Sequence, residues 1–131
     1  MSTIDIIIVT PSKHVFEGTC LDVYVPSSKG QTGLLTEHAH LVSQLGAGVI
    51  TIHQTEGDKK MALRGGFFEV SDNKVMILAD QAAFATDIDV DRLKAQREEL
   101  ETQLLSPDVS VQQREELFAT RDWLQAQAEL I

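Results

Sequence analysis

The sequence predicts a β-sandwich of about ten short strands, followed by a C-terminal antiparallel hairpin of two helices. Short β-branched or alternating segments, separated by turns rich in Gly, Pro and Asn, fill residues 1–86, and such a series is typical of sandwiches and barrels. From residue 87 onward the apolar residues recur at helical spacing instead. We therefore expect two domains, a β-sandwich over residues 1–86 and a helical hairpin over residues 87–131.

Each strand of the first domain is expected from β-branched or alternating residues bounded by a turn signal. Residues 4–10 form the first such run, and Pro11 ends it because proline cannot donate to a sheet ladder. A polar loop framed by Gly30 and Gly33 follows the third strand, and Gly65-Gly66 is expected to break a later one. Strands are predicted at residues 4–10, 14–19, 20–25, 49–53, 59–64, 67–70 and 75–79, the last two forming a hairpin about residues 71–74.

Both helices of the second domain carry start signals. Asp89 is a candidate N-cap of the first helix, and Ser106-Pro107-Asp108 ends that helix. Ser110 with Gln113 has the spacing of a capping box that starts the second helix. The apolar stripes of the two helices are narrow, so we expect the hairpin to be only weakly anchored to the sandwich. The stripe residues are Val90, Leu93, Leu100 and Leu104 on the first helix and Leu117, Leu124, Ala128 and Ile131 on the second.

Composition excludes several classes of protein. The 131-residue chain has a net charge of −9, which argues against a nucleic-acid partner because such a protein needs a basic face. No apolar run approaches the length of a membrane span, so we expect no direct insertion into a membrane. The single cysteine, Cys20, excludes a disulfide framework, and we expect it to be an inert, partly buried thiol.

The residues show no catalytic constellation. The loop at residues 27–33 lacks the Gly-Lys-Ser/Thr ending of a phosphate cradle. His38 and His40 have a spacing that a metal could use, but no third ligand lies nearby in the sequence. No nucleophile has a base and an orienting group beside it. We therefore expect no catalytic residues and no metal, and a binding or structural module rather than an enzyme.

Several short motifs together resemble one family. They begin with Val9-Thr10-Pro11 and Val15-Phe16-Glu17-Gly18 and continue with Gly30-x-x-Gly33-Leu34-Leu35 and His38-Ala39. The segments Gly48-Val49-Ile50-Thr51-Ile52, Gly65-Gly66-Phe67-Phe68-Glu69-Val70 and Val75-Met76-Ile77-Leu78-Ala79-Asp80 complete the set. With a sandwich followed by a helical hairpin, the chain resembles the epsilon subunit of F-type ATP synthase.

The resemblance implies a non-catalytic subunit of the rotor's central stalk, which couples proton-driven rotation of the c-ring to the gamma subunit and the catalytic head. It implies a peripheral protein on the cytoplasmic face of the bacterial inner membrane, because the sequence opens without a transit-like segment. By motif match, Gln31 and Thr32 would contact the c-ring. Thr10, His38 and Ser43 would contact gamma. An acid is usual in the family at position 31, so the c-ring contact here would rely on hydrogen bonds.

The resemblance also implies a contact between the hairpin and the alpha and beta subunits, which in many relatives inhibits ATP hydrolysis. Those relatives use basic residues against an acidic segment of beta. Residues 87–131 here contain eleven acids and five bases, a net charge of −6. Because like charges repel in a partly buried interface, we expect inhibition by this hairpin to be weak or absent.

Some relatives bind ATP on the hairpin through an Ile/Leu-Asp-x-x-Arg-Ala motif. Ile88, Asp89 and Arg92 match it, and Leu93 stands where alanine is expected. Two interpretations stay open here: a nucleotide site, or an N-cap aspartate with Arg92 on a solvated face. No resident cofactor is expected apart from such ATP binding. The alternatives to a rotor subunit are a nucleotide-sensing conformational switch and an unrelated β-sandwich adaptor.

Overall fold

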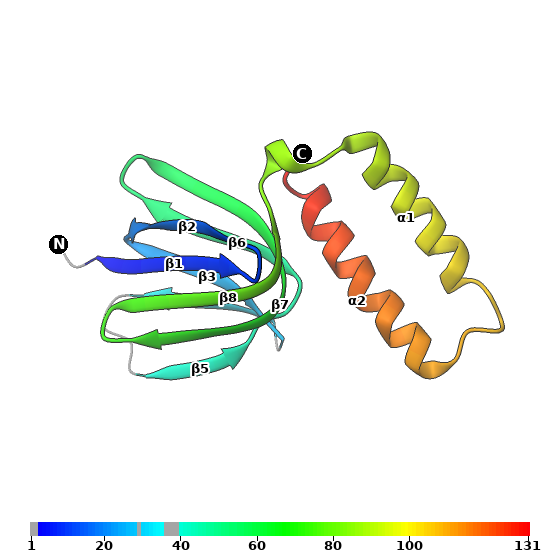
Figure 1. The fold of residues 1–131 in the computed structure, drawn as a ribbon, viewed down its shortest axis with the longest axis horizontal. Coiled ribbons are helices and arrows are strands. Elements are labelled where there is room, and N and C mark those ends of the chain that lie inside the picture. The colour runs from blue at the N-terminus through cyan, green and yellow to red at the C-terminus, as the bar shows by residue number, and fades with distance from the viewer. Residues whose placement is uncertain (1–2, 29, 36–39) are drawn as a thin grey trace.

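The computed structural model describes residues 3–28, 30–35 and 40–131, and of residues 30–35 the backbone alone. Within these residues, eight strands and a short 3₁₀ turn precede two helices (Figure 1). The strands are β1 (Ile4–Thr10), β2 (Lys13–Cys20), β3 (Asp22–Ser27), β4 (Gly30–Leu35), β5 (Leu41–Gln44), β6 (Gly48–Gln54), β7 (Gly57–Ser71) and β8 (Lys74–Ala83). The 3₁₀ turn is η1 (Ala85–Asp87), and the helices are α1 (Val90–Leu104) and α2 (Val111–Ala128).

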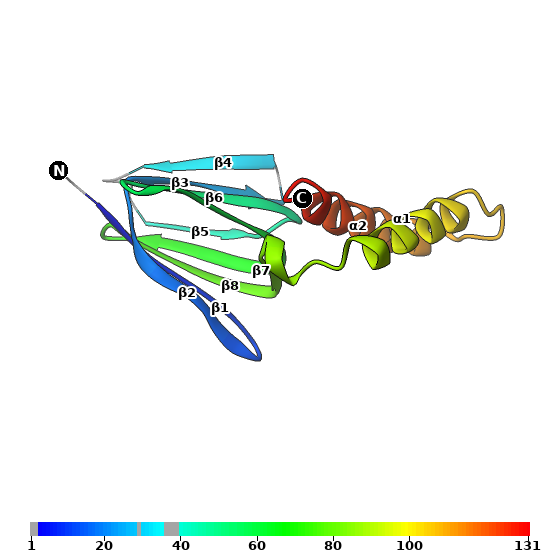
Figure 2. The ribbon, with the colours of Figure 1, turned by 90° about the horizontal axis from the view of Figure 1, so that it is seen from above.

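The strands form two facing layers that share the long strand β7. One layer holds β4, β3 and β6 beside the first half of β7, and the other holds β5, β8, β1 and β2 around its second half (Figure 2). Between the halves lie Gly65 and Gly66, whose φ angles of +69° and +94° are open to glycine but strained for other residues. The glycine pair therefore lets one hydrogen-bonded strand pass from layer to layer.

The strands β5 and β6 run antiparallel to β7 and follow it around the same corner. Both pair antiparallel with β7 in one continuous register, β5 along residues 67–70 and β6 along residues 57–63. Between them the Leu45 amide donates to the Gly66 carbonyl oxygen over 2.9 Å. The long strand β7 and the segment from β5 to β6 therefore bend together and form the corner of the sandwich.

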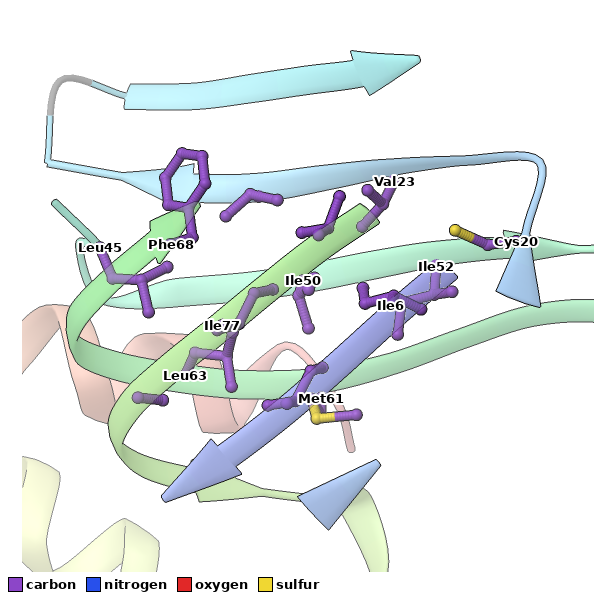
Figure 3. Close-up of a cluster of buried hydrophobic side chains, with 14 of the residues drawn as sticks. Ile6, Cys20, Val23, Leu45, Ile50, Ile52, Met61, Leu63, Phe68 and Ile77 are labelled. Carbon is purple, nitrogen blue, oxygen red and sulfur yellow. The ribbon is translucent and has the colours of Figure 1, made fainter. Parts of the chain in front are cut away.

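The core lies between the two layers and is apolar (Figure 3). Ile6 and Ile8 of β1, Ile52 of β6, and Phe68 and Ile77 of the second layer are almost completely buried in it. The parallel pairing of β1 with β8 brings the first and last strands of the sandwich together. The predicted fold class is confirmed, since a sandwich precedes two helices, although eight strands rather than about ten are found among the described residues.

Two local predictions differ from the structure. Gly65-Gly66 does not break a strand, because β8 pairs with β7 on both sides of the glycines. Residues 30–33 are not a loop but the start of β4, since Gly30 and Gln31 pair with Ser27 and Pro26 of β3. In contrast, the hairpin between β7 and β8 is confirmed, with Asp72 and Asn73 at φ +49° and +61° as a two-residue turn of this kind requires.

The helical hairpin begins and ends at the predicted signals. The Asp89 side chain accepts from the Arg92 amide over 3.1 Å and caps α1. Ser110 and Gln113 form the reciprocal capping box of α2. Leu93, Leu100 and Leu124 form the core between the helices, and α2 is the helix that packs on β6 and β7. The hairpin therefore sits at one end of the sandwich (Figures 1 and 2).

Replacing Gly66 with alanine should destabilise the sandwich strongly. A Cβ atom there would overlap the Leu78 carbonyl group, with its carbon at 2.9 Å, in a backbone conformation that already strains an L residue. We expect Gly66→Ala to lower the free energy of unfolding, measured by urea denaturation, by about 2–4 kcal/mol.

The matched control is Gly57→Ala. Gly57 also has a positive φ, of +131°, but a Cβ there meets no atom within 4 Å. This control should lower the free energy of unfolding by only about 1 kcal/mol, the cost of the backbone conformation alone. Equal losses in the two variants would contradict the role given to the Gly66–Leu78 approach.

Candidate functional site

His53 forms a small structural cluster with two carboxylates and a tyrosine. His53 Nδ1 lies 2.6 Å from Asp58 Oδ1, and its Nε2 lies 3.5 Å from Asp22 Oδ1. The Tyr24 ring meets the imidazole edge-on, with 5.7 Å between ring centres. This cluster ties β3, β6 and β7 together. No group of three possible ligands suited to a metal ion occurs in the described part of the chain.

An apolar surface covers the outside of the layer that contains β1, β5, β7 and β8. Val42, Phe67 and Met76 are 66%, 45% and 48% exposed on three neighbouring strands. The register places Val42 opposite Glu69, and Glu69 opposite Met76. We call this surface the outer apolar face; half-buried apolar residues extend it, and its members are Ile7, Val9, Val42, Phe67, Met76 and Leu78.

Of the residues expected to contact gamma, Thr10 and Ser43 lie on separate strands. Thr10 ends β1, at the tip of the β1–β2 hairpin that stands away from the rest of its layer (Figure 2). Ser43 lies on β5, opposite the buried Phe68, and β8 and β7 separate β5 from β1. His38 lies outside the described residues. The three contacts stay predictions. The outer apolar face, on the strands from β1 to β5, was not predicted from the sequence.

The residues expected to contact the c-ring lie on β4. The backbone of Gln31 pairs with Pro26, and that of Thr32 pairs with Val25. Their side chains are outside what the structure describes, so this contact also stays a prediction. The structure shows that both residues lie on a paired strand and not on a free loop.

The residues expected to bind a nucleotide line one cavity between the hairpin and the sandwich. Ile88, Asp89 and Arg92 lie along this cavity of about 380 Å³, together with Arg64 of β7, which the sequence did not indicate. Two arginines and two aspartates, the second being Asp87, are its charged groups.

This set of side chains fits a triphosphate poorly. The Asp89 carboxylate is engaged by the Arg92 amide and that of Asp87 by the Phe84 amide, over 3.0 Å. The two carboxylates balance the two arginines, so the cavity offers a polyanion no net positive charge. Nucleotide binding by Ile88, Asp89 and Arg92 stays a prediction, while the capping interpretation of Asp89 is confirmed.

Cys20 is buried at the end of β2. Burial, with smaller contributions from the Asp22 and Asp5 carboxylates, raises the pKa of its thiol to about 11. The thiolate is the nucleophilic form of cysteine, so the expectation of an inert thiol agrees with the structure.

Among the helices that the structure describes, none is both long and apolar enough to cross a membrane.

Comparison with known proteins identifies similar chains over most of the length. The family model "ATP synthase, Delta/Epsilon chain, beta-sandwich domain" matches residues 3–85. The ATP synthase epsilon chain of Brevibacillus brevis is 42% identical over 106 residues, covering 79% of this chain and 80% of that one. The epsilon chain of Leptospira borgpetersenii is 39% identical over 107 residues, covering 82% and 83%. That of Microcystis aeruginosa is 31% identical over 126 residues, covering 96% and 91%.

Two solved structures share the fold. A chain of the Euglena gracilis mitochondrial ATP synthase structure, described as OSCP/F1/c-ring in rotational state 1, matches with a TM-score of 0.83 and 22% identity, covering 98% of this chain and 82% of that one. A chain of the Tetrahymena thermophila structure, described as central stalk/c-ring, matches with a TM-score of 0.59 and 13% identity, covering 96% and 94%. At these identities the likeness concerns the fold alone.

The Cys20 thiol should react with a thiol reagent only slowly in the folded protein. A pKa raised from 9.0 to about 11 lowers the thiolate fraction near pH 8 about a hundredfold, and burial slows access further. The rate should rise steadily as the pH increases toward 11. The measurement is the rate of modification at several pH values, with the urea-unfolded chain as the control. Equal rates for the folded and unfolded chains at pH 8 would contradict this environment for Cys20.

Proposed function

We propose, since the chain belongs to the ATP synthase epsilon-chain family, that it is a non-catalytic subunit of the rotor in an F-type ATP synthase. In this role it stands between the c-ring and gamma and passes proton-driven rotation toward the catalytic head. We place it on the cytoplasmic face of a bacterial inner membrane, as a peripheral subunit. The two solved structures with this fold are described as parts of a c-ring or central-stalk assembly, which supports the proposal.

The observation that carries the proposal is the outer apolar face. Val42, Phe67 and Met76 expose large apolar side chains on three paired strands of a rigid sheet. Monomeric proteins rarely expose several large apolar side chains on one face, and such a surface marks a protein interface. Glu69, between Val42 and Met76, is a charged group within it. Gamma is the partner we assign to it, with Thr10, His38 and Ser43 as further contacts. Burial of these side chains would stabilise such a joint without requiring any chemistry.

The c-ring contact is assigned to the other layer. We propose that Gln31 and Thr32 contact the polar loops of the ring from β4, the strand that pairs with β3. Two different layers of one sandwich would then hold the two rotor partners, and the shared strand β7 would join them mechanically.

The hairpin's contact with alpha and beta is proposed to be weak. Its net charge of −6 opposes approach to the acidic segment of beta that the family uses. A rotor subunit that couples through its sandwich needs no strong contact there. Regulation of ATP hydrolysis by residues 87–131 is therefore a minor part of the function.

Placing a carboxylate in the outer apolar face should prevent gamma binding. Met76→Asp would bury a charge without a partner in the interface, a cost of several kcal/mol, and each 1.4 kcal/mol weakens binding about tenfold. We expect at least a hundredfold loss of affinity for purified gamma, measured by surface plasmon resonance. The fold should persist because the Met76 side chain points away from the core.

The matched control is Thr55→Asp, which adds the same charge in the exposed turn between β6 and β7. It should bind gamma like the unaltered chain. Unchanged gamma binding by the Met76 variant would overturn the assignment of this surface.

Truncation after Thr86 should leave coupled ATP synthesis intact. The sandwich has its own core, and the acidic hairpin contributes little to inhibition. In the assembled complex we expect ATP hydrolysis to rise by less than about twofold, a change well below 1 kcal/mol. Co-purification of the truncated subunit with the complex is the control for assembly. A strong rise in hydrolysis would show that the hairpin is an effective inhibitor.

A further inference from the structure

A charged side chain stands among the apolar side chains of the outer apolar face. Glu69 lies on β7, and the register places Val42 of β5 on one side of it and Met76 of β8 on the other. Phe67 precedes Glu69 by two residues, so both side chains project from the same side of β7. All three neighbours are large apolar side chains that are exposed to solvent. The carboxylate therefore has apolar groups on three sides, at the place where a partner would cover the face.

The Glu69 carboxylate has no counter-charge in the described chain. Its side chain is exposed, and within residues 3–28 and 40–131 it makes no hydrogen bond and no ion pair. Lys74 lies on the same face, but the register pairs it with Ser71 and with Asp5 instead. None of these described groups replaces solvent around the Glu69 carboxylate.

A second glutamate, at the edge of the same face, shows the contrast. Glu17 of β2 lies opposite Ile7 of β1. Its Oε1 atom is 3.2 Å from Nε2 of His14, which lies on the same strand. Glu17 thus has a partner within the chain, and it lies on the outermost strand of the sheet. Glu69, between two paired strands, has neither a partner nor an edge through which water would reach it in a complex.

Covering the outer apolar face would remove water from Glu69. Burying an ionised carboxylate without a partner is strongly unfavourable, so a wholly apolar partner surface would be rejected at this position. A cationic side chain would replace the lost hydration with charge-assisted hydrogen bonds. Arginine suits such a place well, because its planar guanidinium binds a carboxylate with two donors and is weakly hydrated.

We infer that the partner covering the outer apolar face brings an arginine or lysine side chain to Glu69, within a contact that is otherwise apolar. Glu69 then selects the partner by charge, while Val42, Phe67 and Met76 contribute buried apolar area. The inference rests on the proposed function, in which gamma covers this face, and it states which chemistry gamma presents there.

The test measures the binding of purified gamma to the full chain by surface plasmon resonance. Glu69→Gln keeps the size of the side chain and removes its charge. We expect binding to weaken by at least about thirtyfold, because the cation of the partner is left buried without a counter-charge. The loss should lie in the dissociation rate, and it should persist at about 0.5 M salt, because a buried pair is screened much less than an exposed one.

Glu69→Leu separates this inference from a purely apolar contact. Leucine would extend the apolar surface, so a wholly apolar partner would bind this variant more tightly. We expect instead a loss at least as large as that of Glu69→Gln. The matched control is Glu56→Gln, the same change in the exposed turn between β6 and β7, and it should bind gamma like the unaltered chain. Circular dichroism checks that each variant is folded.

The outcomes distinguish this inference from the proposed function. Gamma binding by Glu69→Gln or Glu69→Leu that equals or exceeds binding by Glu56→Gln would overturn the inference and leave the proposed function in place. A loss confined to the association rate that disappears in salt would overturn it too, because Glu69 would then act from an exposed position. Failure of both the unaltered chain and Glu56→Gln to bind gamma would overturn the proposed function, and the inference with it.

Discussion

The close approach of Gly66 to the Leu78 carbonyl is the constraint on which the rest of the structure depends. It allows β7 and β8 to turn the corner of the sandwich while they remain hydrogen-bonded. The residues that point inward are Met61 and Leu63 before the corner, and Phe68 and Val70 after it. The alternation therefore changes phase at Gly65-Gly66, and the left-handed backbone of the two glycines absorbs that change.

The phase change explains why one strand can serve two outer surfaces. Before the corner, the outward positions of β7 carry Ala62, which is fully buried, and Arg64, which donates to Thr120 of α2. After it, the outward positions carry Phe67 and Glu69, which lie on the exposed side of the other layer. The surface that meets α2 and the outer apolar face are thus joined by a single covalent, hydrogen-bonded strand.

How far the sequence could predict this structure depended on the range of the interaction. Turn chemistry at Asp72-Asn73 and caps at Asp89 and Ser110 are local, and all were predicted. A change of phase at two glycines has the same local appearance as the end of a strand, so the continuity of β7 was missed. The parallel pairing of β1 with β8 joins segments about 70 residues apart, and no local pattern encodes it.

The outer apolar face was missed for the same reason: its members come from four strands, and each strand shows only ordinary alternation. For the candidate site, Ile88, Asp89 and Arg92 were found through a motif, whereas Arg64 reaches their cavity from a distant strand.

The charge of the helical hairpin and its contact with the sandwich depend on different interactions. Its net charge is −6 over residues 87–131, while its contact with the sandwich rests on the packing of α2 against β6 and β7 and on the hydrogen bond from Arg64 to Thr120. A contact decided by shape is changed little by salt or by counterions, because screening acts on charges and not on packing. The surface charge can therefore change in evolution without disturbing the docked state. Conversely, a larger side chain at the buried Ala126 would disturb the packing and leave the surface charge as it is. This independence allows a subunit to keep a compact hairpin even where the net charge of that hairpin is negative.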